Sequence, residues 1–258
     1  MEVFRCSPIR GFLLDITGVL YNSSPNTLGI AIPGSIDAID RLYSESRVRF
    51  VSNESSESRG ELARKLKKLG FNLKEEHIFT PAPVAIQYLK QHALKPHLLV
   101  HQGALKEFAD MSKGEPNCVV MGDAECDFTY DAMNEAFRVL TALDDPLIIT
   151  LGFGKFYQRV DGPCLDVGGF AKALQYATDA RIVTFGKPAE SFFLAAIKDM
   201  RLSKDEVVMI GDDIVSDIGG AMKVGIRAVQ VRTGKWRYYD SSFLFCSVNK
   251  NSIVLVAQ

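Results

Sequence analysis

Residues 11–14 form a short apolar segment, Gly-Phe-Leu-Leu, that ends directly in Asp15. A continuous hydrophobic run of this kind is typical of a strand buried on both faces of a parallel sheet. Ligands of open α/β sheets bind just outside the carboxyl ends of such strands. An aspartate there can ligate a hard cation or attack phosphorus, although an isolated aspartate can also simply cap the next turn. The choice depends on what the other strand ends carry.

Short apolar runs alternate with segments of helical spacing along most of the chain. Strands are expected at 48–51, 98–100, 118–121, 147–151, 182–185 and 207–210, and helices at 34–44, 60–69, 84–94, 130–143, 169–176 and from 188 through 197. Residues 21–33 and 152–157 are expected to form loops, since they are rich in glycine and polar residues. The alternation predicts parallel β-α units and therefore an α/β fold.

The composition excludes several classes of protein. A chain of 258 residues with 47% hydrophobic residues can bury a sizeable core. A net charge of -1 provides no field for nucleic acid or an anionic membrane, and no apolar stretch approaches the roughly 20 residues of a membrane span. The five cysteines are scattered without a CxxC pair, and the four histidines lack ligand spacing, so neither disulfides nor zinc are expected. We expect a soluble intracellular protein.

Two further strand ends carry groups that suit a phosphoryl ligand. Ser52 and Asn53 follow the second strand, next to the start of a helix, where a hydroxyl and helix N–H groups can bind a phosphate oxygen. Taken alone, Ser52 is equally well explained as a helix cap. Lys187 follows the strand at 182–185 and precedes Pro188, so it presents a positive charge to the same sheet edge as Asp15.

The strongest evidence for a cation is the acidic segment after the strand at 207–210. Asp212, Asp213 and Asp217 lie within a few residues of one another at this strand end, in a chain whose net charge is close to zero. Carboxylates held this closely need a cation, and ligation by oxygen alone is typical of magnesium. We therefore expect Mg²⁺ as the cofactor.

Taken together, the four strand-end motifs resemble those of the haloacid dehalogenase superfamily, in the same order. They are Asp15-Ile16-Thr17-Gly18, Ser52-Asn53, Gly186-Lys187-Pro188 and Gly211-Asp212-Asp213 with Asp217. The phrases MNEAFRVL, LDVGGFAKALQYA and AVQVRTGKWR resemble one branch of phosphatases in that superfamily. This resemblance extends from about Arg10 to Arg237 and stops before the tail, Tyr238 to Gln258, where the branch continues with a further strand and helix.

The resemblance implies a two-domain organisation. The long segment between the second and third motifs matches the branch whose α/β cap is inserted there. We expect a Rossmann-like core domain formed by residues 1–80 and 184–258, and a cap domain formed by residues 81–183. The cap is expected to close over the site, and the resemblance implies a homodimer that pairs through the caps. It also implies a cytoplasmic and nuclear location.

The resemblance further implies a magnesium-dependent phosphatase that acts through an aspartyl-phosphate on phosphohistidine, phospholysine, imidodiphosphate and inorganic pyrophosphate. Asp15, Thr17 and Lys187 are the expected catalytic residues. The expected substrate-binding residues are Asp15, Ile16, Thr17, Ser52, Asn53 and Lys187, and the expected metal ligands are Asp15, the Thr17 backbone carbonyl and Asp212. Asp213 and Asp217 are expected to position metal waters and Lys187.

Thr17 stands where most phosphatases of the superfamily carry a second aspartate that protonates the leaving group. A threonine hydroxyl is a poor proton donor at neutral pH, which favours phosphorus–nitrogen and phosphoanhydride bonds over alkyl esters. Two alternative functions are less consistent with these residues. A phosphoryl-binding protein without activity is disfavoured by the intact Asp15, Lys187 and Asp212, and a cation pump is excluded because no membrane span is present.

Overall fold

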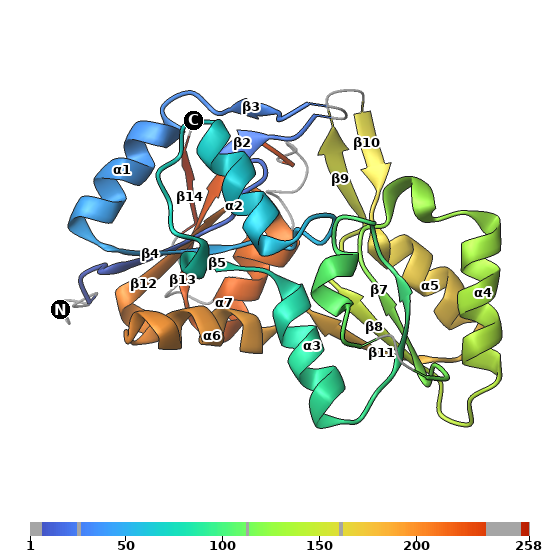
Figure 1. Ribbon diagram of the computed structural model, residues 1–258. Helices are drawn as coiled ribbons and strands as arrows, with labels where there is room; N and C mark the ends of the chain where they lie inside the picture. Colours follow the sequence, from blue (N-terminus) through green and yellow to red (C-terminus); the bar gives the residue numbers. More distant parts are fainter. Residues whose placement is uncertain (1–6, 25–26, 112–113, 160–161, 236–253, 258) are drawn as a thin grey trace.

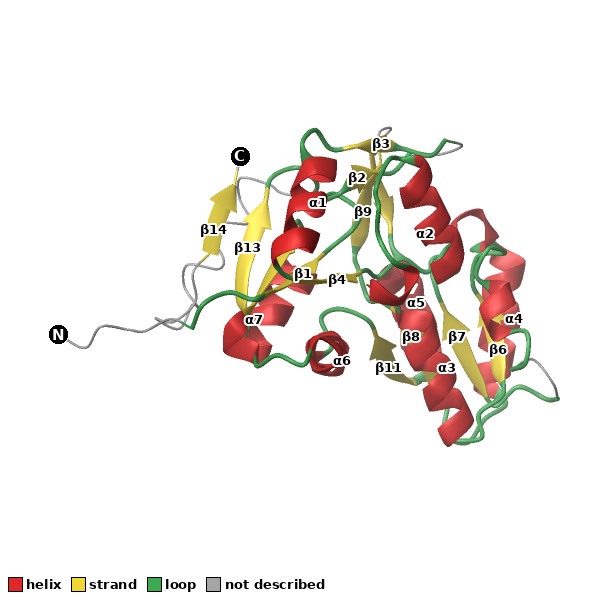
Figure 2. Cartoon of the chain, turned by 60° about the vertical axis from the view of Figure 1, so that its left-hand side comes forward, coloured by secondary structure: helices red, strands yellow, loops and turns green. Residues whose placement is uncertain are grey.

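The chain forms two parallel β-sheets that lie side by side, each with helices around it (Figures 1 and 2). The structure is a computed structural model and describes residues 7–24, 27–111, 114–159, 162–235 and 254–257. The larger sheet consists of β1 (Gly11–Leu14), β4 (Arg47–Val51), β5 (Ile78–Phe79), β12 (Val207–Gly211), β13 (Arg227–Val231) and β14 (Val254–Ala257), in the spatial order β14-β13-β12-β1-β4-β5. The predicted α/β fold with a parallel-sheet core is confirmed.

Helices cover both faces of the larger sheet. They are α1 (Ser35–Glu45) and α2 (Arg59–Lys68) on one face, and α6 (Glu190–Met200) and α7 (Gly220–Val224) on the other. Consecutive strand residues point to opposite faces, so Leu13 packs with α6 and α7 whereas Leu14 packs with α1 and α2. Coverage of both faces explains why the two central strands, β1 and β12, are continuous apolar runs rather than alternating ones.

The smaller sheet has the same layered construction. Its strands are β6 (Pro96–Leu99), β7 (Cys118–Met121), β8 (Leu147–Leu151) and β11 (Arg181–Phe185), in the order β11-β8-β7-β6. Helix α3 (Pro81–Gln91) packs on one face, and α4 (Tyr130–Thr141) and α5 (Val167–Thr178) pack on the other. All of β8 is buried, including Thr150, whose hydroxyl lies 2.9 Å from that of Thr184 on the adjacent strand.

Helix boundaries follow local capping signals. Ser58 caps α2 by accepting a hydrogen bond from the Glu61 N–H at 3.3 Å, and Thr129 caps α4 by accepting one from the Ala132 N–H at 3.1 Å. Helix α3 begins at Pro81, earlier than the predicted start at residue 84, because proline is well suited to the first helical position. Short 3₁₀ helices lie at Glu75–His77, Leu105–Phe108, Glu125–Asp127 and Lys204–Glu206, and a π-helical turn at Ile214–Gly219 runs into α7.

Short antiparallel strands occur in or beside the two segments predicted to be loops. In the first, β2 (Tyr21–Asn22) pairs with β3 (Ile30–Ala31). The second runs into β9 (Phe156–Arg159), which pairs with β10 (Gly162–Leu165). The prediction of loops was wrong at these positions, because strands this short do not show an alternating pattern.

The chain crosses from the larger to the smaller sheet after β5 and returns after β11. Helix α3 already packs on the smaller sheet, and β11 extends to Phe185, just past the expected limit at residue 183. The domain limits themselves stay a prediction. The carboxyl ends of β1, β4 and β12 and those of β7, β8 and β11 border one cavity of about 840 Å³ between the sheets.

The end of the chain adds a strand to the larger sheet. β14 pairs in parallel with β13, with Ala228 opposite Val254. The rest of the tail, within the predicted divergent segment 238–258, lies outside the described residues. Among the residues that the structure describes, no helix is both long and apolar enough to cross a membrane.

Candidate active site

Asp15 lies at the carboxyl edge of the larger sheet, directly after β1. Its backbone N–H donates to the Ile210 carbonyl at 2.9 Å, which extends the pairing of β1 with β12 by one residue. Its Oδ1 accepts the Ile16 N–H at 2.7 Å and lies 2.7 Å from the Lys187 Nζ. The side chain borders the cavity and is almost completely buried.

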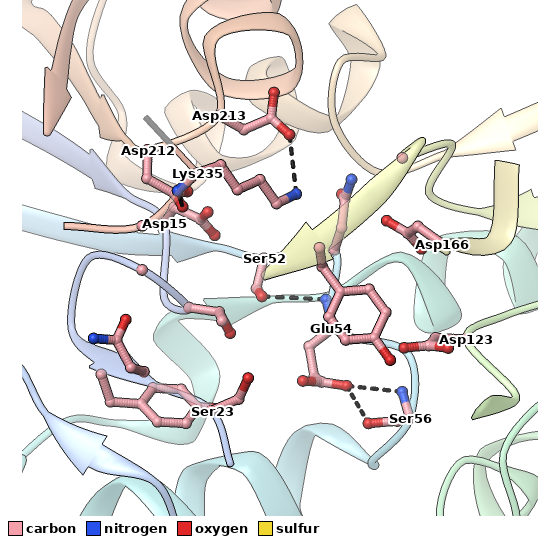
Figure 3. A pocket seen from close by; sticks show the side chains of 18 of the residues that line it. Asp15, Ser23, Ser52, Glu54, Ser56, Asp123, Asp166, Asp212, Asp213 and Lys235 are labelled. Carbon is pink, nitrogen blue, oxygen red and sulfur yellow. Dashed lines mark hydrogen bonds and ion pairs between the residues drawn. The ribbon is translucent and has the colours of Figure 1, made fainter. Parts of the chain in front are cut away.

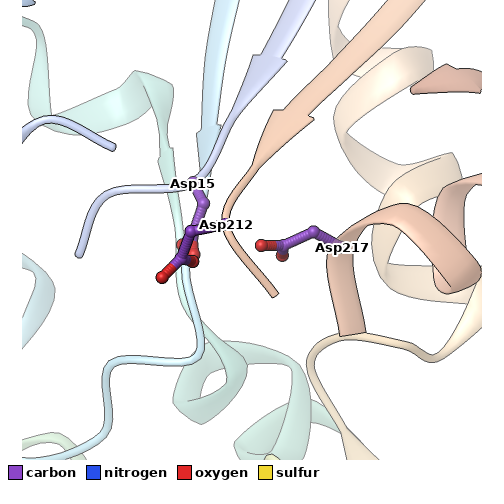
Figure 4. A group of neighbouring side chains, drawn as sticks. All are labelled: Asp15, Asp212 and Asp217. Atoms are coloured by element: carbon purple, nitrogen blue, oxygen red, sulfur yellow. The ribbon is translucent and has the colours of Figure 1, made fainter. Parts of the chain in front are cut away.

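Three carboxylates converge at this edge. One oxygen each of Asp15, Asp212 and Asp217 lies within 4.8 Å of the others, and Figure 4 shows the three side chains turned toward one another. Asp15 and Asp212 follow the adjacent strands β1 and β12, whereas Asp217 projects from the π-helical turn. All three are buried, so their mutual repulsion is not screened by water.

Asp212 is held from one side by the segment that follows β13. The Lys235 N–H donates to Asp212 Oδ2 at 2.8 Å, and the Gln230 amide donates to the Asp212 carbonyl at 3.2 Å. A Cβ at Gly18 or Gly234 would overlap Oδ2, and Gly18 also has a φ of +85°, so both positions require glycine. Oδ1 of Asp212 has no hydrogen-bond partner among the described residues. The carboxylate therefore offers one oxygen to a ligand.

Lys187 is fixed by Asn53 rather than by its own secondary structure. The Asn53 amide donates to the Lys187 carbonyl at 2.9 Å, and the Lys187 N–H donates to Asn53 Oδ1 at 2.7 Å. The ammonium lies 2.7 Å from oxygens of both Asp15 and Asp217. Sequence reasoning assigned Asn53 to the substrate, whereas the structure shows its side chain holding the lysine that lies next to Asp15.

Asp213 and Lys235 form a second charged pair at the same edge. Asp213 Oδ1 accepts the Val215 and Ser216 N–H groups at 2.9 Å and so caps the π-helical turn. Its Oδ2 lies 3.0 Å from the Lys235 Nζ (Figure 3). This lysine lowers the pKa of Asp213 despite burial, which keeps the carboxylate ionised. Lys235 was not predicted from the sequence.

The protonation of the cluster is set by burial and by mutual repulsion. Burial, with Asp15 as the second cause, raises the pKa of Asp212 to about 7. The same two causes raise the pKa of Asp217 well above its usual value. Burial alone would lower the pKa of Lys187, but Asp15 and Asp217 outweigh it and raise that pKa. A bound divalent cation would displace protons from these carboxyl groups.

The donor set fits a hard divalent cation. The cluster offers carboxylate oxygens alone, the unpartnered Oδ1 of Asp212 among them, and no histidine or cysteine belongs to it within the described ranges. Oxygen ligands of this kind suit Mg²⁺ or Ca²⁺. The structure thus brings the predicted ligands Asp15 and Asp212 together, and adds Asp217, which the sequence assigned to positioning. Which of the three bind the cation stays a prediction.

The remaining predicted residues differ in their access to the cavity. Thr17 and Ser52 border it, and the Ser52 hydroxyl accepts the Glu54 N–H at 3.1 Å. The Ile16 side chain is completely buried in the core with Phe50, and its N–H is bonded to Asp15. Their roles in binding substrate stay predictions.

The cavity has a second wall, formed mainly by the smaller sheet, which sequence reasoning missed. Asp123 follows β7, and Asp166 caps α5 by accepting the Val167 N–H at 2.7 Å. Glu54, from the loop after β4, adjoins them. Figure 3 shows Asp123 and Asp166 on the side of the pocket away from Asp15 and Asp212. The sequence held one clue, because Gly122-Asp123 after a buried strand repeats the pattern of Gly211-Asp212.

This fold and this arrangement of carboxylates and lysine define a member of the haloacid dehalogenase-like hydrolases. A family model described as haloacid dehalogenase-like hydrolase matches residues 12–115, and a second, described as HAD-hydrolase-like, matches residues 184–242. The chain belongs to this family and is a hydrolase. Phospholysine phosphohistidine inorganic pyrophosphate phosphatase of Xenopus laevis is 48% identical over 233 residues, which are 90% of this chain and 86% of that protein. The predicted resemblance is confirmed.

Other relatives extend the comparison. The human protein of the same name is 47% identical over 237 residues, 92% of this chain and 87% of that protein. Haloacid dehalogenase-like hydrolase domain-containing protein 2 of Pongo abelii is 40% identical over 236 residues, 91% of this chain and 88% of that protein.

Solved structures share the fold at low sequence identity. A 4-nitrophenylphosphatase from Thermotoga maritima superposes with a TM-score of 0.81 at 21% identity, covering 97% of this chain and 94% of that one. A glycerol phosphate phosphatase from Mycobacterium tuberculosis, solved in complex with magnesium, gives a TM-score of 0.79 at 22% identity, covering 97% and 74%. At these identities the likeness establishes the fold alone.

Proposed function

We propose that this chain is a Mg²⁺-dependent phosphatase that cleaves phosphorus–nitrogen bonds and inorganic pyrophosphate through an aspartyl-phosphate on Asp15. The observation that supports it most is that Asp15, Asp212 and Asp217 at the edge of the larger sheet meet Lys187, which follows β11 of the smaller sheet, beside a cavity of about 840 Å³. The substrates come from the name of the relatives, which are phospholysine phosphohistidine inorganic pyrophosphate phosphatases.

In the first proposed step, an Asp15 carboxylate oxygen attacks phosphorus, and the bond to the leaving group breaks with its electron pair going to the leaving atom. In the second, water attacks the aspartyl-phosphate, releases inorganic phosphate and restores the carboxylate. Lys187, which lies 2.7 Å from Asp15, neutralises charge on the transferring phosphoryl oxygens, and the Ser52 hydroxyl donates a hydrogen bond to one of them. Asn53 keeps Lys187 in place.

Mg²⁺ would be held by Asp15, Asp212 and the Thr17 carbonyl, and when bound it supplies positive charge next to the transferring group. Asp217 keeps Lys187 oriented through its 2.7 Å contact, and Asp213 fixes the turn that carries Asp217. The wall formed by the smaller sheet limits the size of the substrate, which favours small phosphoryl compounds over folded phosphoproteins.

The test is hydrolysis of phospholysine, phosphohistidine, imidodiphosphate, pyrophosphate and an alkyl phosphate by the purified protein, with Mg²⁺ and with EDTA. We expect Mg²⁺-dependent phosphate release from the first four. Borohydride trapping followed by peptide mass analysis should locate the intermediate at Asp15. Release of phosphate without modification of Asp15 during turnover would exclude the covalent route.

The proposal includes a homodimer that pairs through the caps, and a cytoplasmic and nuclear location. Light scattering at micromolar concentration measures the first, and a monomeric mass would remove it. Microscopy of the tagged full chain measures the second.

A further inference from the structure

The two sides of the cavity differ in how their carboxylates are neutralised. On the side of the larger sheet, Lys187 contacts Asp15 and Asp217 at 2.7 Å, and Lys235 contacts Asp213 at 3.0 Å. On the opposite side, Glu54, Asp123 and Asp166 form no ion pair with any side chain that the structure describes. This second wall therefore carries negative charge that no direct ion pair neutralises, although Lys65 near Glu54 and Lys235 near Asp166 offset part of it at longer range.

The three carboxylates of that wall affect one another. Burial raises the pKa of Asp123 to about 7, with further contributions from Asp166 and Glu54. Burial also raises the pKa of Asp166. Glu125, which also lines the cavity, adds to the negative charge near Asp123, whereas Lys235 near Asp166 is already bonded to Asp213. Holding such groups together costs free energy unless a cation joins them.

An independent feature of the same cavity is the hydroxyl of Tyr21. This side chain, from β2, lines the cavity and is completely buried. Its hydroxyl lies near the side chains of Thr17 and Lys65 but makes no hydrogen bond of normal geometry with any described residue. Burial raises the pKa of this phenol, with Glu54 as the second cause, so the hydroxyl stays protonated beside that carboxylate. A buried polar atom without a partner, next to the wall, is a position that a polar ligand can satisfy.

We propose that Glu54, Asp123 and Asp166 form a cation-selective wall next to the leaving group of the substrate, so that the preferred substrates are phosphoramidates whose bridging nitrogen, from an amine or an imidazole, is protonated before it leaves. This inference rests on the proposed function and narrows it. Within the substrates named above, phospholysine and phosphohistidine are preferred over pyrophosphate, because the leaving phosphate of pyrophosphate is an anion.

The chemistry explains why a negative wall helps. A phosphorus–nitrogen bond breaks readily when its nitrogen is protonated, because the bonding electron pair then goes to nitrogen and a neutral amine or imidazole leaves. Negative charge near this nitrogen favours its protonated form, for the same reason that a carboxylate raises the pKa of a nearby lysine. The wall thereby supplies on the leaving-group side the assistance that Thr17, which has no acidic proton, cannot give from the other side.

The experiment compares kcat/KM for phospholysine and for pyrophosphate in the wild type, Asp123→Asn, Asp166→Asn and the double variant. Asparagine keeps the shape of each side chain and can still cap α5 at position 166. The matched control is Asp131→Asn, an exposed carboxylate on α4 away from the cavity. We expect kcat/KM for phospholysine to fall on the order of tenfold in each single variant, mainly through KM, and kcat/KM for pyrophosphate to rise.

Two outcomes in these variants would contradict the proposed role of the wall. One is a phospholysine-to-pyrophosphate ratio of kcat/KM equal to that of the wild type, and the other is a parallel loss of both activities. Failure of the proposed function looks different, because the wild type would then release no phosphate from any substrate. In that case the affinity for each substrate tests the wall instead of the activity. The Asp15→Asn protein should bind phospholysine more tightly than pyrophosphate in calorimetry. Equal or reversed affinities would reject the wall, and loss of the preference in Asp15→Asn/Asp123→Asn would support it.

Discussion

The carboxyl edges of the two sheets face one cavity, and each carries an aspartate after a glycine. The two edges differ in whether lysines neutralise their carboxylates. At the larger sheet, Asp212 accepts a hydrogen bond from the Lys235 N–H. Lys187 and Lys235 neutralise the neighbouring carboxylates of Asp15 and Asp213. At the smaller sheet Asp123 has no described cation partner, and its backbone N–H is bonded to the Ser55 hydroxyl at 2.8 Å. In our proposal, the same strand-end geometry serves the chemical step on one side and selection of the leaving group on the other.

The largest effect is expected at the larger sheet. Asp15→Asn replaces the nucleophile with an amide of the same size, so kcat should fall by about 10⁴-fold or more for every substrate. The fold should persist, since the Ile16 N–H can still bond to the side-chain carbonyl. Steady-state phosphate release measures the loss, and circular dichroism checks the fold. Wild-type turnover in this variant would show that the larger-sheet edge is not the reacting one.

Thr17→Asp tests whether the missing proton donor at position 17 causes the preference for phosphorus–nitrogen and phosphoanhydride bonds over alkyl esters. A carboxyl group at this position can protonate an alkoxide, so activity on an alkyl phosphate should rise about 100-fold relative to imidodiphosphate. Thr17→Ser keeps a hydroxyl and is the matched control. Metal content must be measured in both variants, because Thr17 adjoins Asp15. If the metal is retained and the ratio does not change, substrate choice belongs to the smaller-sheet wall alone.

The pKa values at the two edges predict different pH behaviour. Burial and Asp15 raise the pKa of Asp212 to about 7, so protons compete with Mg²⁺ as pH falls through 7. The affinity for Mg²⁺ should therefore fall roughly twentyfold between pH 7.5 and 5.5. Calorimetry at several pH values measures it. Asp123→Asn should leave this dependence as it is, although the pKa of Asp123 is also about 7, because Asp123 lies on the other wall. A shifted midpoint in that variant would mean that both edges titrate as one site.

The sequence predicted the larger-sheet edge well and the smaller-sheet edge poorly, for a physical reason. Asp15 and Asp212 each follow an apolar strand of the larger sheet, and the carboxyl ends of parallel strands must meet. Lys187 follows β11 of the smaller sheet, so its contact with Asp15 joins the two sheets. Asp166 follows β10, which belongs to a two-stranded antiparallel ribbon, so no buried strand marks it. Lys235 lies after β13 in a segment without a strand-end carboxylate of its own.

Tertiary contacts also decide what a correctly located residue does. Asn53 was expected to bind substrate, but its amide bonds to the backbone of Lys187, a contact between residues 134 positions apart that no local pattern indicates. Which edge of the smaller sheet faces Asp15 likewise depends on how the two sheets pack together. Local spacing does not contain that information.

The smallest expected effect is at Lys235, the group that adjoins both edges. Lys235→Met removes the ammonium from Asp213, which caps the turn that carries Asp217, but leaves the backbone N–H on Asp212. The affinity for Mg²⁺ should therefore fall only about fivefold, and Lys235→Arg should restore it.

Lys235→Met should also change the preference between substrates, in the direction opposite to the change in Asp166→Asn. Burial raises the pKa of Asp166 and Lys235 offsets part of this rise, so removal of Lys235 makes the potential near Asp166 more negative. The phospholysine-to-pyrophosphate ratio of kcat/KM should then rise about threefold in Lys235→Met, whereas it falls in Asp166→Asn. A ratio that falls in both variants would mean that Lys235 assists the leaving group directly. A ratio that does not change in Lys235→Met would show that the two edges act independently.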